Sequence, residues 1–368
     1  MARIEQVEVF MVDLVPKVKR VDAIQSFVSQ ETPFVRITAD DGAVGTGYSY
    51  TIGTGFHAVV ELLARNLAPQ LIGRDPDEIE AIWKALFFHT HATAVGAITA
   101  LALAAIDTAL WDMRCRRSGR PLHIEAGGAQ QSVPLYTTEG GWLQLPVEAL
   151  VEDALRAKAA GFGGSKIKVG RPPKEDARRL EAVREAVGDD FEIFVDGNQG
   201  AAVDEAIRRA RLYEPFDLGW YEEPLPAEDL GGHIRLSAAT TLPVAVGESI
   251  YSLQHFREYL QRDAASVVQV DVARIGGITP WLKVAHLAES FNMPVCPHFL
   301  MELHVALTAA VPNGRWVEYI PQLDSLTTDS MNIVDGRAVP SSEPGLGIAW
   351  DWAAIDRMRV EGCTRIIR

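Results

Sequence analysis

The sequence predicts an α/β protein: a (β/α)8 barrel with an N-terminal α+β capping domain that the C-terminal tail completes. From Val133 onward, short apolar runs alternate with amphipathic helical segments, a pattern typical of a parallel sheet covered by helices. There are eight such runs in succession, which is the number that closes a barrel. A doubly wound open sheet is the alternative, but eight units in line favour closure.

The region before Val133 has a different pattern. Alternating apolar residues in segments 7–11 and 35–39 indicate antiparallel strands, and Asp41-Gly42 is a turn signal before a further strand at 43–50. We expect polar or glycine-containing loops at 20–31 and 51–56. Residues 57–118 have the periodicity of helices. This part of the chain therefore predicts the capping domain.

The barrel strands are expected where the apolar runs fall. The first helix between them follows Pro146 and ends before Gly161, and another opens at Thr279-Pro280, a capping residue followed by proline. The expected strands are 133–137, 165–169, 191–196, 219–223, 244–248, 266–271, 294–298 and 315–319.

These patterns divide the chain into three parts. We expect the capping domain at 1–130, the barrel at 131–335 and a C-terminal segment at 336–368. The segment from Glu343 to Trp352 has a strand-like apolar pattern, and we expect it to rejoin the capping domain.

Composition narrows the classes of function. The 368 residues carry 35 basic and 49 acidic side chains, a net charge of −14, and no basic run that would serve a nucleic acid. We expect neither a signal peptide nor a membrane span. Cys115, Cys296 and Cys363 form neither a zinc pattern nor a disulfide framework, so a cytoplasmic protein is the simplest interpretation.

Each expected strand from the second onward ends near a polar residue. The gaps between successive members of this set are 28, 26, 26, 23, 27 and 20 residues by subtraction, about the length of one βα unit. In a barrel, these positions meet at the C-terminal face, where barrel enzymes hold their active sites. The set is Lys168, Asp196, Glu222, Glu248, Asp271, His298 and Glu318.

Three consecutive members of this set are carboxylates. Asp196, Glu222 and Glu248 on adjacent strands would repel one another, and hard oxygen ligands favour Mg²⁺, with Mn²⁺ as the alternative. Each carboxylate alone could be a solvated loop charge or a helix cap. Three at equal spacing favour a metal site.

Two lysines occupy one strand. Lys166 and Lys168 alternate with Ile167, so they share one face. If that face is the barrel interior, two cations lie near the acidic residues, and a neighbouring cation or metal would depress a lysine pKa and yield a base. An outward-facing surface pair is the alternative.

The last three polar positions predict acid–base chemistry. Asp271 and His298 fit a carboxylate that orients an imidazole base, although a buried structural histidine is the alternative. Glu318 could hydrogen-bond an enolate oxygen if it were protonated, and a solvated strand-end charge is an equal alternative.

At these residues the chain resembles the mandelate racemase subgroup of the enolase superfamily, over nearly its full length. The resemblance includes the Ile106–Asp112 helix, the Lys166-x-Lys168 strand and all later strand ends. Segments 136–141 and 297–304 look like L-talarate/galactarate dehydratases, whereas segments 45–50 and 343–348 look like 3,6-anhydro-L-galactonate cycloisomerases.

The resemblance implies a role for each residue. It implies that the three carboxylates bind Mg²⁺, that Lys168 is a base and that Lys166 holds the substrate carboxylate. His298, paired with Asp271, would act on the opposite face, and Glu318 would stabilise the enolate. The first two loops of the capping domain would close over the substrate, and the family favours a homo-oligomer.

The leading hypothesis is an Mg²⁺-dependent lyase that abstracts the proton alpha to a carboxylate and dehydrates an acid sugar to a 2-keto-3-deoxy acid. The alternative is an isomerase, either a racemase or epimerase or a cycloisomerase, on the same scaffold. A non-catalytic protein that binds sugar acids is a third possibility, which the full set of bases and ligands disfavours.

Overall fold

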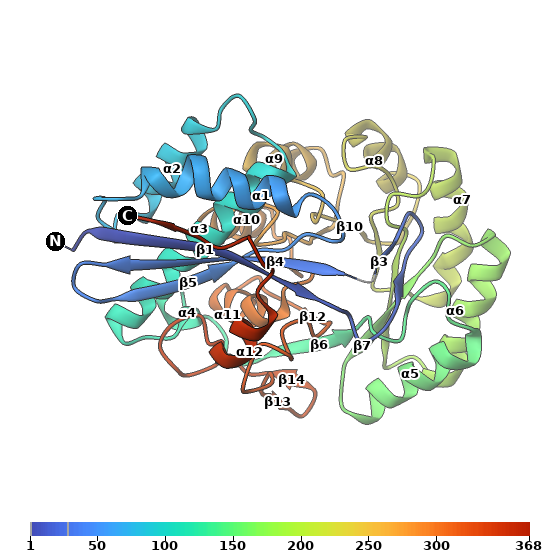
Figure 1. The fold of residues 1–368 in the computed structure, drawn as a ribbon. Helices are drawn as coiled ribbons and strands as arrows, with labels where there is room; N and C mark the ends of the chain where they lie inside the picture. Colours follow the sequence, from blue (N-terminus) through green and yellow to red (C-terminus); the bar gives the residue numbers. More distant parts are fainter. Residues whose placement is uncertain (1, 28) are drawn as a thin grey trace.

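The computed structural model describes residues 2–27 and 29–368 of the chain. An antiparallel sheet in the order β15-β1-β4-β5 forms the core of the capping domain and lies beside the helical part of that domain (Figure 1). The first strands and helices are β1 (Ile4–Leu14), β2 (Arg20–Val21), β3 (Ser26–Phe27), β4 (Gln30–Ala39), β5 (Val44–Tyr48), α1 (Phe56–Leu62), α2 (Ile79–His89), α3 (Ala97–Ser118) and α4 (Leu122–Glu125).

Helix α3 is the central helix of this domain, because most of its side chains are buried. Strand β5 packs against it at very short range. A Cβ atom added at Gly45 would lie 2.1 Å from the Ala109 carbonyl oxygen, and one added at Gly47 would lie 2.3 Å from that of Ala105. The glycines of segment 45–50 therefore permit close contact between strand and helix.

The barrel is a closed ring of parallel strands, as the sequence predicted. Consecutive strands pair in order, and β12 pairs in parallel with β6, with Glu318 opposite Tyr136. The strands are β6 (Val133–Thr137), β7 (Gly164–Lys168), β8 (Glu192–Asp196), β9 (Trp220–Glu222), β10 (Val244–Val246), β11 (Val267–Val268) and β12 (Val317–Tyr319).

One predicted barrel strand is wrong in detail. Segment 294–298 forms only isolated bridges, in which Val295 joins Val268 on one side and Gly314 on the other. Pro294 and Pro297 flank this position, and proline has no N–H group to extend a ladder of hydrogen bonds. The bridges keep the ring closed between β11 and β12.

Helices cover the outside of the barrel. As predicted, α5 follows Pro146 and ends before Gly161. None of the helices in the described residues is both long enough and apolar enough to cross a membrane. The barrel helices are α5 (Val147–Ala159), α6 (Pro173–Val187), α7 (Val203–Tyr213), α8 (Leu230–Ser237), α9 (Leu253–Gln261), α10 (Ile278–Ser290) and α11 (Met301–Ala310).

The C-terminal segment returns to the capping domain, and segment 343–352 takes part as expected: the Leu346 amide donates to Asp112 Oδ1 at 3.0 Å, and the Trp350 ring packs on Phe34 with the centroids 5.1 Å apart. Segment 343–352 forms no named strand, since Pro344 and the left-handed backbone of Gly345 and Gly347 interrupt it. The returning strand is instead β15, which pairs antiparallel with β1. The division of the chain at residues 130 and 335 stays a proposal. The last elements are β13 (Ile333–Val334), β14 (Arg337–Ala338), α12 (Trp352–Met358) and β15 (Arg365–Ile367).

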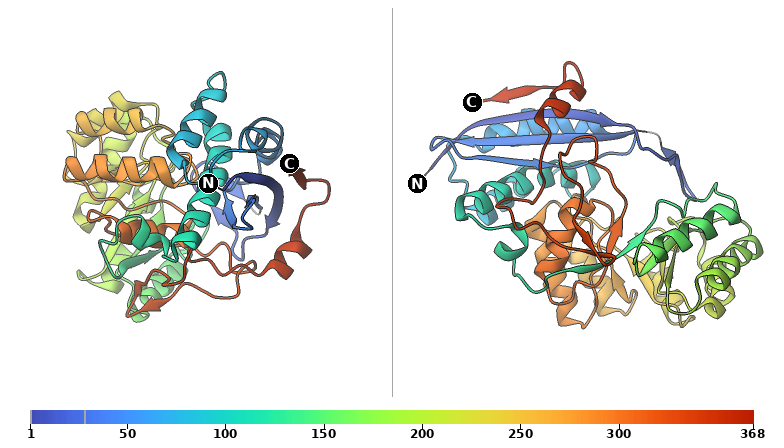
Figure 2. Two further views of the ribbon diagram at one scale, coloured as in Figure 1. Left: turned by 90° about the vertical axis from the view of Figure 1, so that its left-hand side faces the viewer. Right: turned by 90° about the horizontal axis from the view of Figure 1, so that it is seen from below.

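The segment expected as a loop at 20–31 contains the β2–β3 hairpin and the start of β4. The hairpin reaches from the capping sheet toward the barrel, as the right-hand view of Figure 2 shows. There the Leu143 amide donates to the Val21 carbonyl at 2.9 Å. The Ala23 side chain lies so close to Gly170 that a Cβ added to that glycine would be 2.8 Å from it. The hairpin is therefore seated on the barrel loops.

Candidate active site

Strand register places three of the predicted residues side by side. Lys168 on β7 is opposite Asp196 on β8, and Asp196 is opposite Glu222 on β9. All three lie at the C-terminal ends of parallel neighbours, and each is at most 5% exposed. Charged side chains are rarely buried without partners, so their grouping at one end of the barrel needs compensating charge.

The three carboxylates form a compact group. One oxygen from each of Asp196, Glu222 and Glu248 can be chosen so that all three lie within 4.8 Å of one another. Burial and the charge of Asp196 raise the pKa of Glu222 to about 7. The Glu248 Oε2 atom is buried and lies 3.1 Å from His298 Nε2. A set of hard oxygen donors with mutual repulsion fits a divalent cation such as Mg²⁺.

The two lysines point into the barrel toward these carboxylates. Lys166 Nζ lies 2.8 Å from Glu222 Oε1 and 2.9 Å from Glu318 Oε1, and Lys168 Nζ donates to Asp196 Oδ2. Burial alone would lower the pKa of each amine, but the neighbouring carboxylates outweigh it and the pKa of both lysines is raised. The protein's own charges therefore do not depress the pKa of these lysines, and depression by a bound metal stays a prediction.

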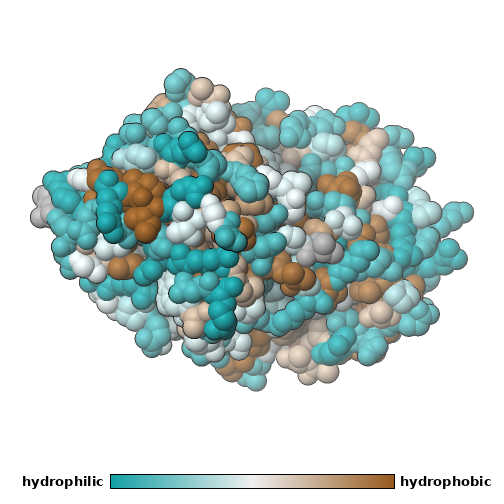
Figure 3. Space-filling view, in the orientation of Figure 1, coloured by the Kyte–Doolittle hydropathy of each residue, from teal (hydrophilic) through white to brown (hydrophobic). Residues whose placement is uncertain are grey.

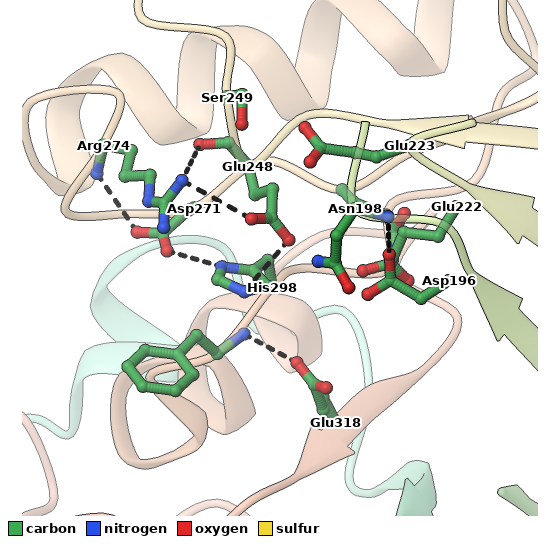
Figure 4. A network of polar contacts seen from close by, with 12 residues as sticks. Asp196, Asn198, Glu222, Glu223, Glu248, Ser249, Asp271, Arg274, His298 and Glu318 are labelled. Carbon is green, nitrogen blue, oxygen red and sulfur yellow. Dashed lines mark hydrogen bonds and ion pairs between the residues drawn. The ribbon is translucent and has the colours of Figure 1, made fainter. Parts of the chain in front are cut away.

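His298 joins two carboxylates at the other end of the group. Its Nδ1 lies 2.8 Å from Asp271 Oδ2, and its Nε2 lies 3.1 Å from Glu248 Oε2 (Figure 4). Burial opposes a charged ring, but Glu248 and Asp271 raise the pKa of His298. Burial would raise the pKa of Asp271, yet the His298 contact lowers it to about 2. Asp271 is therefore an ionised partner that orients the ring.

Glu318 is held by three donors. Thr138 Oγ1 donates to its Oε1 at 2.5 Å, the Phe299 amide donates to its Oε2 at 2.9 Å, and Lys166 completes the set. Burial would raise the pKa of Glu318, but the charges of Lys166 and His298 lower it below its ordinary value. These contacts favour the ionised form of Glu318, whereas the hydrogen bond to an enolate that the sequence suggested needs the protonated form.

Sequence reasoning missed two residues that support His298. Tyr50 donates from its hydroxyl to Asp271 Oδ2 at 2.7 Å, and Arg274 Nε donates to the Tyr50 hydroxyl at 2.8 Å. Figure 4 shows Arg274 beside both Asp271 and Glu248, whose carbonyl accepts from Arg274 Nη1 at 3.2 Å. Tyr50 stands at the end of segment 45–50, which had been noted only for its resemblance.

The capping domain covers part of the site. The β2–β3 hairpin is seated over the barrel mouth, and Asp22 in its turn is only 7% exposed. Cavities include one of about 840 Å³ beside the C-terminal segment, one of about 440 Å³ lined in part by Ser249 and Tyr251, just after Glu248, and one of about 210 Å³ between α2, α3 and α10.

Comparison with known proteins identifies the fold. The description "Enolase C-terminal domain-like" matches residues 149–354, and "Mandelate racemase / muconate lactonizing enzyme, N-terminal domain" matches residues 6–124. The chain belongs to the mandelate racemase subgroup of the enolase superfamily. As a member of this superfamily it is an enzyme, and the paired domain matches agree with a capping domain followed by a barrel.

Individual relatives in the superfamily are dehydratases and cycloisomerases. The chain is 39% identical to L-talarate/galactarate dehydratase of Salmonella typhimurium, over 84% of this chain and 78% of that protein. It is 38% identical to 3,6-anhydro-alpha-L-galactonate cycloisomerase of Streptomyces coelicolor, over 89% of this chain and 91% of that one.

Solved structures give the same relationship. The Salmonella typhimurium dehydratase liganded with Mg and L-lyxarohydroxamate superposes with a TM-score of 0.94 at 35% identity, covering 100% of this chain and 94% of the other. A racemase from Streptomyces coelicolor with bound magnesium superposes with a TM-score of 0.93 at 36% identity, covering 97% and 100%.

Proposed function

We propose that this enzyme abstracts the proton alpha to the carboxylate of an acid sugar and dehydrates it to a 2-keto-3-deoxy acid, with Mg²⁺ as its cofactor. One observation carries the proposal. The row of three carboxylates has a lysine at its Asp196 end and a carboxylate-paired imidazole at its Glu248 end. Two acid–base groups on opposite sides of a cation site are what an elimination of water needs.

The roles of the residues follow from their positions. Asp196, Glu222 and Glu248 would hold the cation, and Lys166 would pair with the substrate carboxylate. A bound Mg²⁺ would supply positive charge that stabilises an enolate and lowers the pKa of nearby amines. Mn²⁺ has the same preference for oxygen ligands.

The protein would carry out two proton transfers, one from the α-carbon and one to the leaving hydroxyl. Lys168, in its neutral form, would take the α-proton, and the C–H electron pair would pass into the enolate. Protonated His298 would then donate to the hydroxyl on the β-carbon, so the C–O bond breaks and water leaves. The resulting enol tautomerises to the ketone. In a syn elimination, His298 could carry out both proton transfers in turn.

The contacts of Glu318 favour an indirect electrostatic role, in which it positions a neighbouring lysine. It is fixed by Thr138, by the Phe299 amide and by Lys166. An ionised Glu318 would hold the Lys166 ammonium in the direction of the substrate carboxylate. Stabilisation of the enolate by Glu318, which the family resemblance implies, would require a proton that the present contacts disfavour.

The same two bases support a second candidate function. Groups on opposite faces of an α-carbon can also remove and return a proton, which is the chemistry of a racemase or epimerase. A cycloisomerase among the relatives keeps that class open as well. In each isomerase reading the product keeps all its oxygen atoms, whereas dehydration releases water.

One experiment separates these alternatives. The Mg²⁺-loaded enzyme is incubated with a panel of mono- and diacid sugars in D₂O, and α-keto acid is measured together with loss of the α-proton signal. We expect α-keto acid from at least one sugar. Exchange without α-keto acid would indicate an isomerase, and neither exchange nor product with any member of the panel would overturn the proposal.

A further inference from the structure

Arg20, on the β2–β3 hairpin, is buried with unused hydrogen-bonding capacity. Arg20 is only 2% exposed. Its Nη2 donates to Glu139 Oε1 at 3.0 Å and to the Pro321 carbonyl at 3.3 Å. Its Nε and Nη1 atoms are buried and have no partner within the described residues. A buried guanidinium with unused donors is costly unless a ligand supplies acceptors.

Arg20 lies one aromatic ring away from each proposed base. Its Cζ is 5.8 Å from the Trp142 ring centroid, and Lys168 Nζ is 5.5 Å from the same ring. Its Cζ is also 5.9 Å from the Phe299 ring, which stacks on His298 with the centroids 5.3 Å apart. Arg20 therefore lies on the capping-domain side of the site, separated from Lys168 and His298 by one aromatic ring each.

Gln322, the residue after Pro321, is a second buried side chain with unused hydrogen-bonding atoms. Gln322 is 8% exposed, and neither polar atom of its side-chain amide has a partner within the described residues. The arginine that contacts the Pro321 carbonyl and the side-chain amide of the following residue both have unused hydrogen-bonding atoms. Such groups recognise an oxygen-rich ligand, because a partner that lacks the matching acceptors leaves them unpaired.

The hairpin holds Arg20 in place by its own contacts. Asp22 Oδ1 accepts from the amides of Ile24 and Gln25 at 2.8 Å each, which fixes the turn. Gln144 Nε2 donates to the Lys19 carbonyl at 2.7 Å and ties the base of the hairpin to the barrel loop. The guanidinium is thereby positioned before the ligand binds, which lowers the entropy lost on binding.

We propose that Arg20 binds the distal carboxylate of the substrate, so that the acid sugar this enzyme prefers is a diacid. The inference rests on the proposed function and adds the substrate class. A guanidinium pairs with a carboxylate through charge-assisted hydrogen bonds, whereas the terminal hydroxymethyl group of a monoacid offers a single neutral oxygen. Glu139 already accepts from Arg20 Nη2, and its negative charge opposes a second anion. The expected gain in affinity for a diacid is therefore moderate.

The test compares matched substrates that differ only at the terminal carbon. The kcat/KM of the wild-type enzyme is measured for galactarate against galactonate and for glucarate against gluconate. We expect the diacid of the more active pair to be favoured about 10- to 100-fold, the range of one charged hydrogen-bonded contact. Equal activity or a preference for the monoacid would overturn the proposal.

Variants then assign the preference to Arg20. Arg20→Met should reduce the diacid-to-monoacid ratio about 10-fold or more, and Arg20→Lys should restore part of it. The matched control is Arg36→Met: Arg36 also packs over an aromatic ring, that of Trp352 at 4.4 Å, and pairs with Glu8 in the capping domain. It should leave the ratio as in wild type.

The outcomes are distinguishable. A purely structural Arg20 would lower kcat/KM for both substrates by the same factor, which would overturn the proposal even if the enzyme stays a dehydratase. If Arg20→Met does not fold, competitive inhibition of the wild type by the unreacted diacid and monoacid gives the same comparison. Failure of every acid sugar to react would instead reject the proposed function.

Discussion

At the scale of single residues, His298 carries the most specific chemistry. It bridges Asp271 and Glu248 from its two ring nitrogens, and Tyr50 and Arg274 hold that arrangement from the capping domain and the next barrel loop. The carboxylates at both nitrogens raise the pKa of His298, which suits a group that donates a proton to a leaving hydroxyl.

We predict that His298→Asn lowers dehydration by about 10²- to 10⁴-fold, the contribution of a general acid–base group. Lys168 stays in place in this variant, so exchange of the α-proton with D₂O should continue. Turnover and exchange are measured on the best substrate of the acid-sugar panel. Near-native turnover by the variant would mean that His298 is a structural histidine.

We predict that chelation abolishes activity and that Mg²⁺ or Mn²⁺ restores it. The reason is that Asp196, Glu222 and Glu248 bring three buried carboxylates together, and a cation offsets their repulsion. Glu222→Gln should weaken Mg²⁺ binding by calorimetry, whereas Glu343→Gln, at an exposed position in the C-terminal segment, should not. Full activity after exhaustive chelation would contradict the metal site.

The residues at the strand ends were predictable because spacing alone places them on one face of a barrel. Asp196, Glu222 and Glu248 could be predicted as a group because the spacing between them equals the length of one βα unit. Tyr50 and Arg20 were not predictable in this way, because their proximity to the site depends on how the capping domain folds over the barrel. The charge states of Lys168 and Glu318 also depend on distances between side chains, which a sequence does not contain.

At the scale of elements, a buried carboxylate on α3 links the capping domain to the barrel. Asp107 on α3 accepts from the Thr279 amide at 2.8 Å and from the Thr279 hydroxyl at 2.7 Å, at the start of α10. The sequence placed the cap of this helix at Thr279, but α10 begins at Ile278, and Gly277 is its N-cap residue. The long-range partner overrides the local capping signal.

Asp107 predicts a pH dependence of stability. Burial raises its pKa to about 7 in the folded protein, from an ordinary value of about 3.8. Between these values the folded state binds a proton that the unfolded state does not, so the free energy of unfolding falls as pH rises from about 4 to about 7. The slope from this group reaches about 1.4 kcal/mol per pH unit.

The measurement is urea unfolding of the wild type and of Asp107→Asn across that range. The variant cannot titrate at this position, so wild-type stability should decline relative to the variant as pH rises. Thr99→Ser, elsewhere on α3, is the control and should follow the wild type. Parallel curves for wild type and Asp107→Asn would show that the Asp107 carboxyl does not change its protonation between the two states.

At the scale of the whole molecule, the repeating pattern of short strands and helices was sufficient to predict a closed barrel. It was not sufficient to find the returning strand, since β15 is only three residues long and its pairing with β1 spans the chain. The β2–β3 hairpin is similarly short and owes its position to the loops of the barrel beneath it. Both elements are positioned by contacts with residues distant in the sequence, and local periodicity does not indicate such contacts.

The surface of the capping domain supports the remaining prediction, a homo-oligomer. The face in Figure 3 is mostly hydrophilic, with its largest hydrophobic patch near the end that carries both termini in Figure 1. Large apolar side chains are also exposed around the connection from α2 to α3: Phe88 is 59% exposed, Val95 is 53% and Ile98 is 38%. Grouped apolar residues on a protein surface mark contact sites more often than free surface.

We predict that the wild-type protein is oligomeric by light scattering at micromolar concentration, and that the α2–α3 connection contributes to the contact. Phe88→Ser with Val95→Ser removes two exposed apolar side chains without emptying the core, so the folded chain should persist while the oligomer dissociates to smaller species. Leu155→Ser, at a 43% exposed apolar position on the barrel helix α5, is the matched control and should keep the wild-type mass. A wild-type monomer would contradict the prediction outright, and an unchanged mass in the double variant would move the contact to another face.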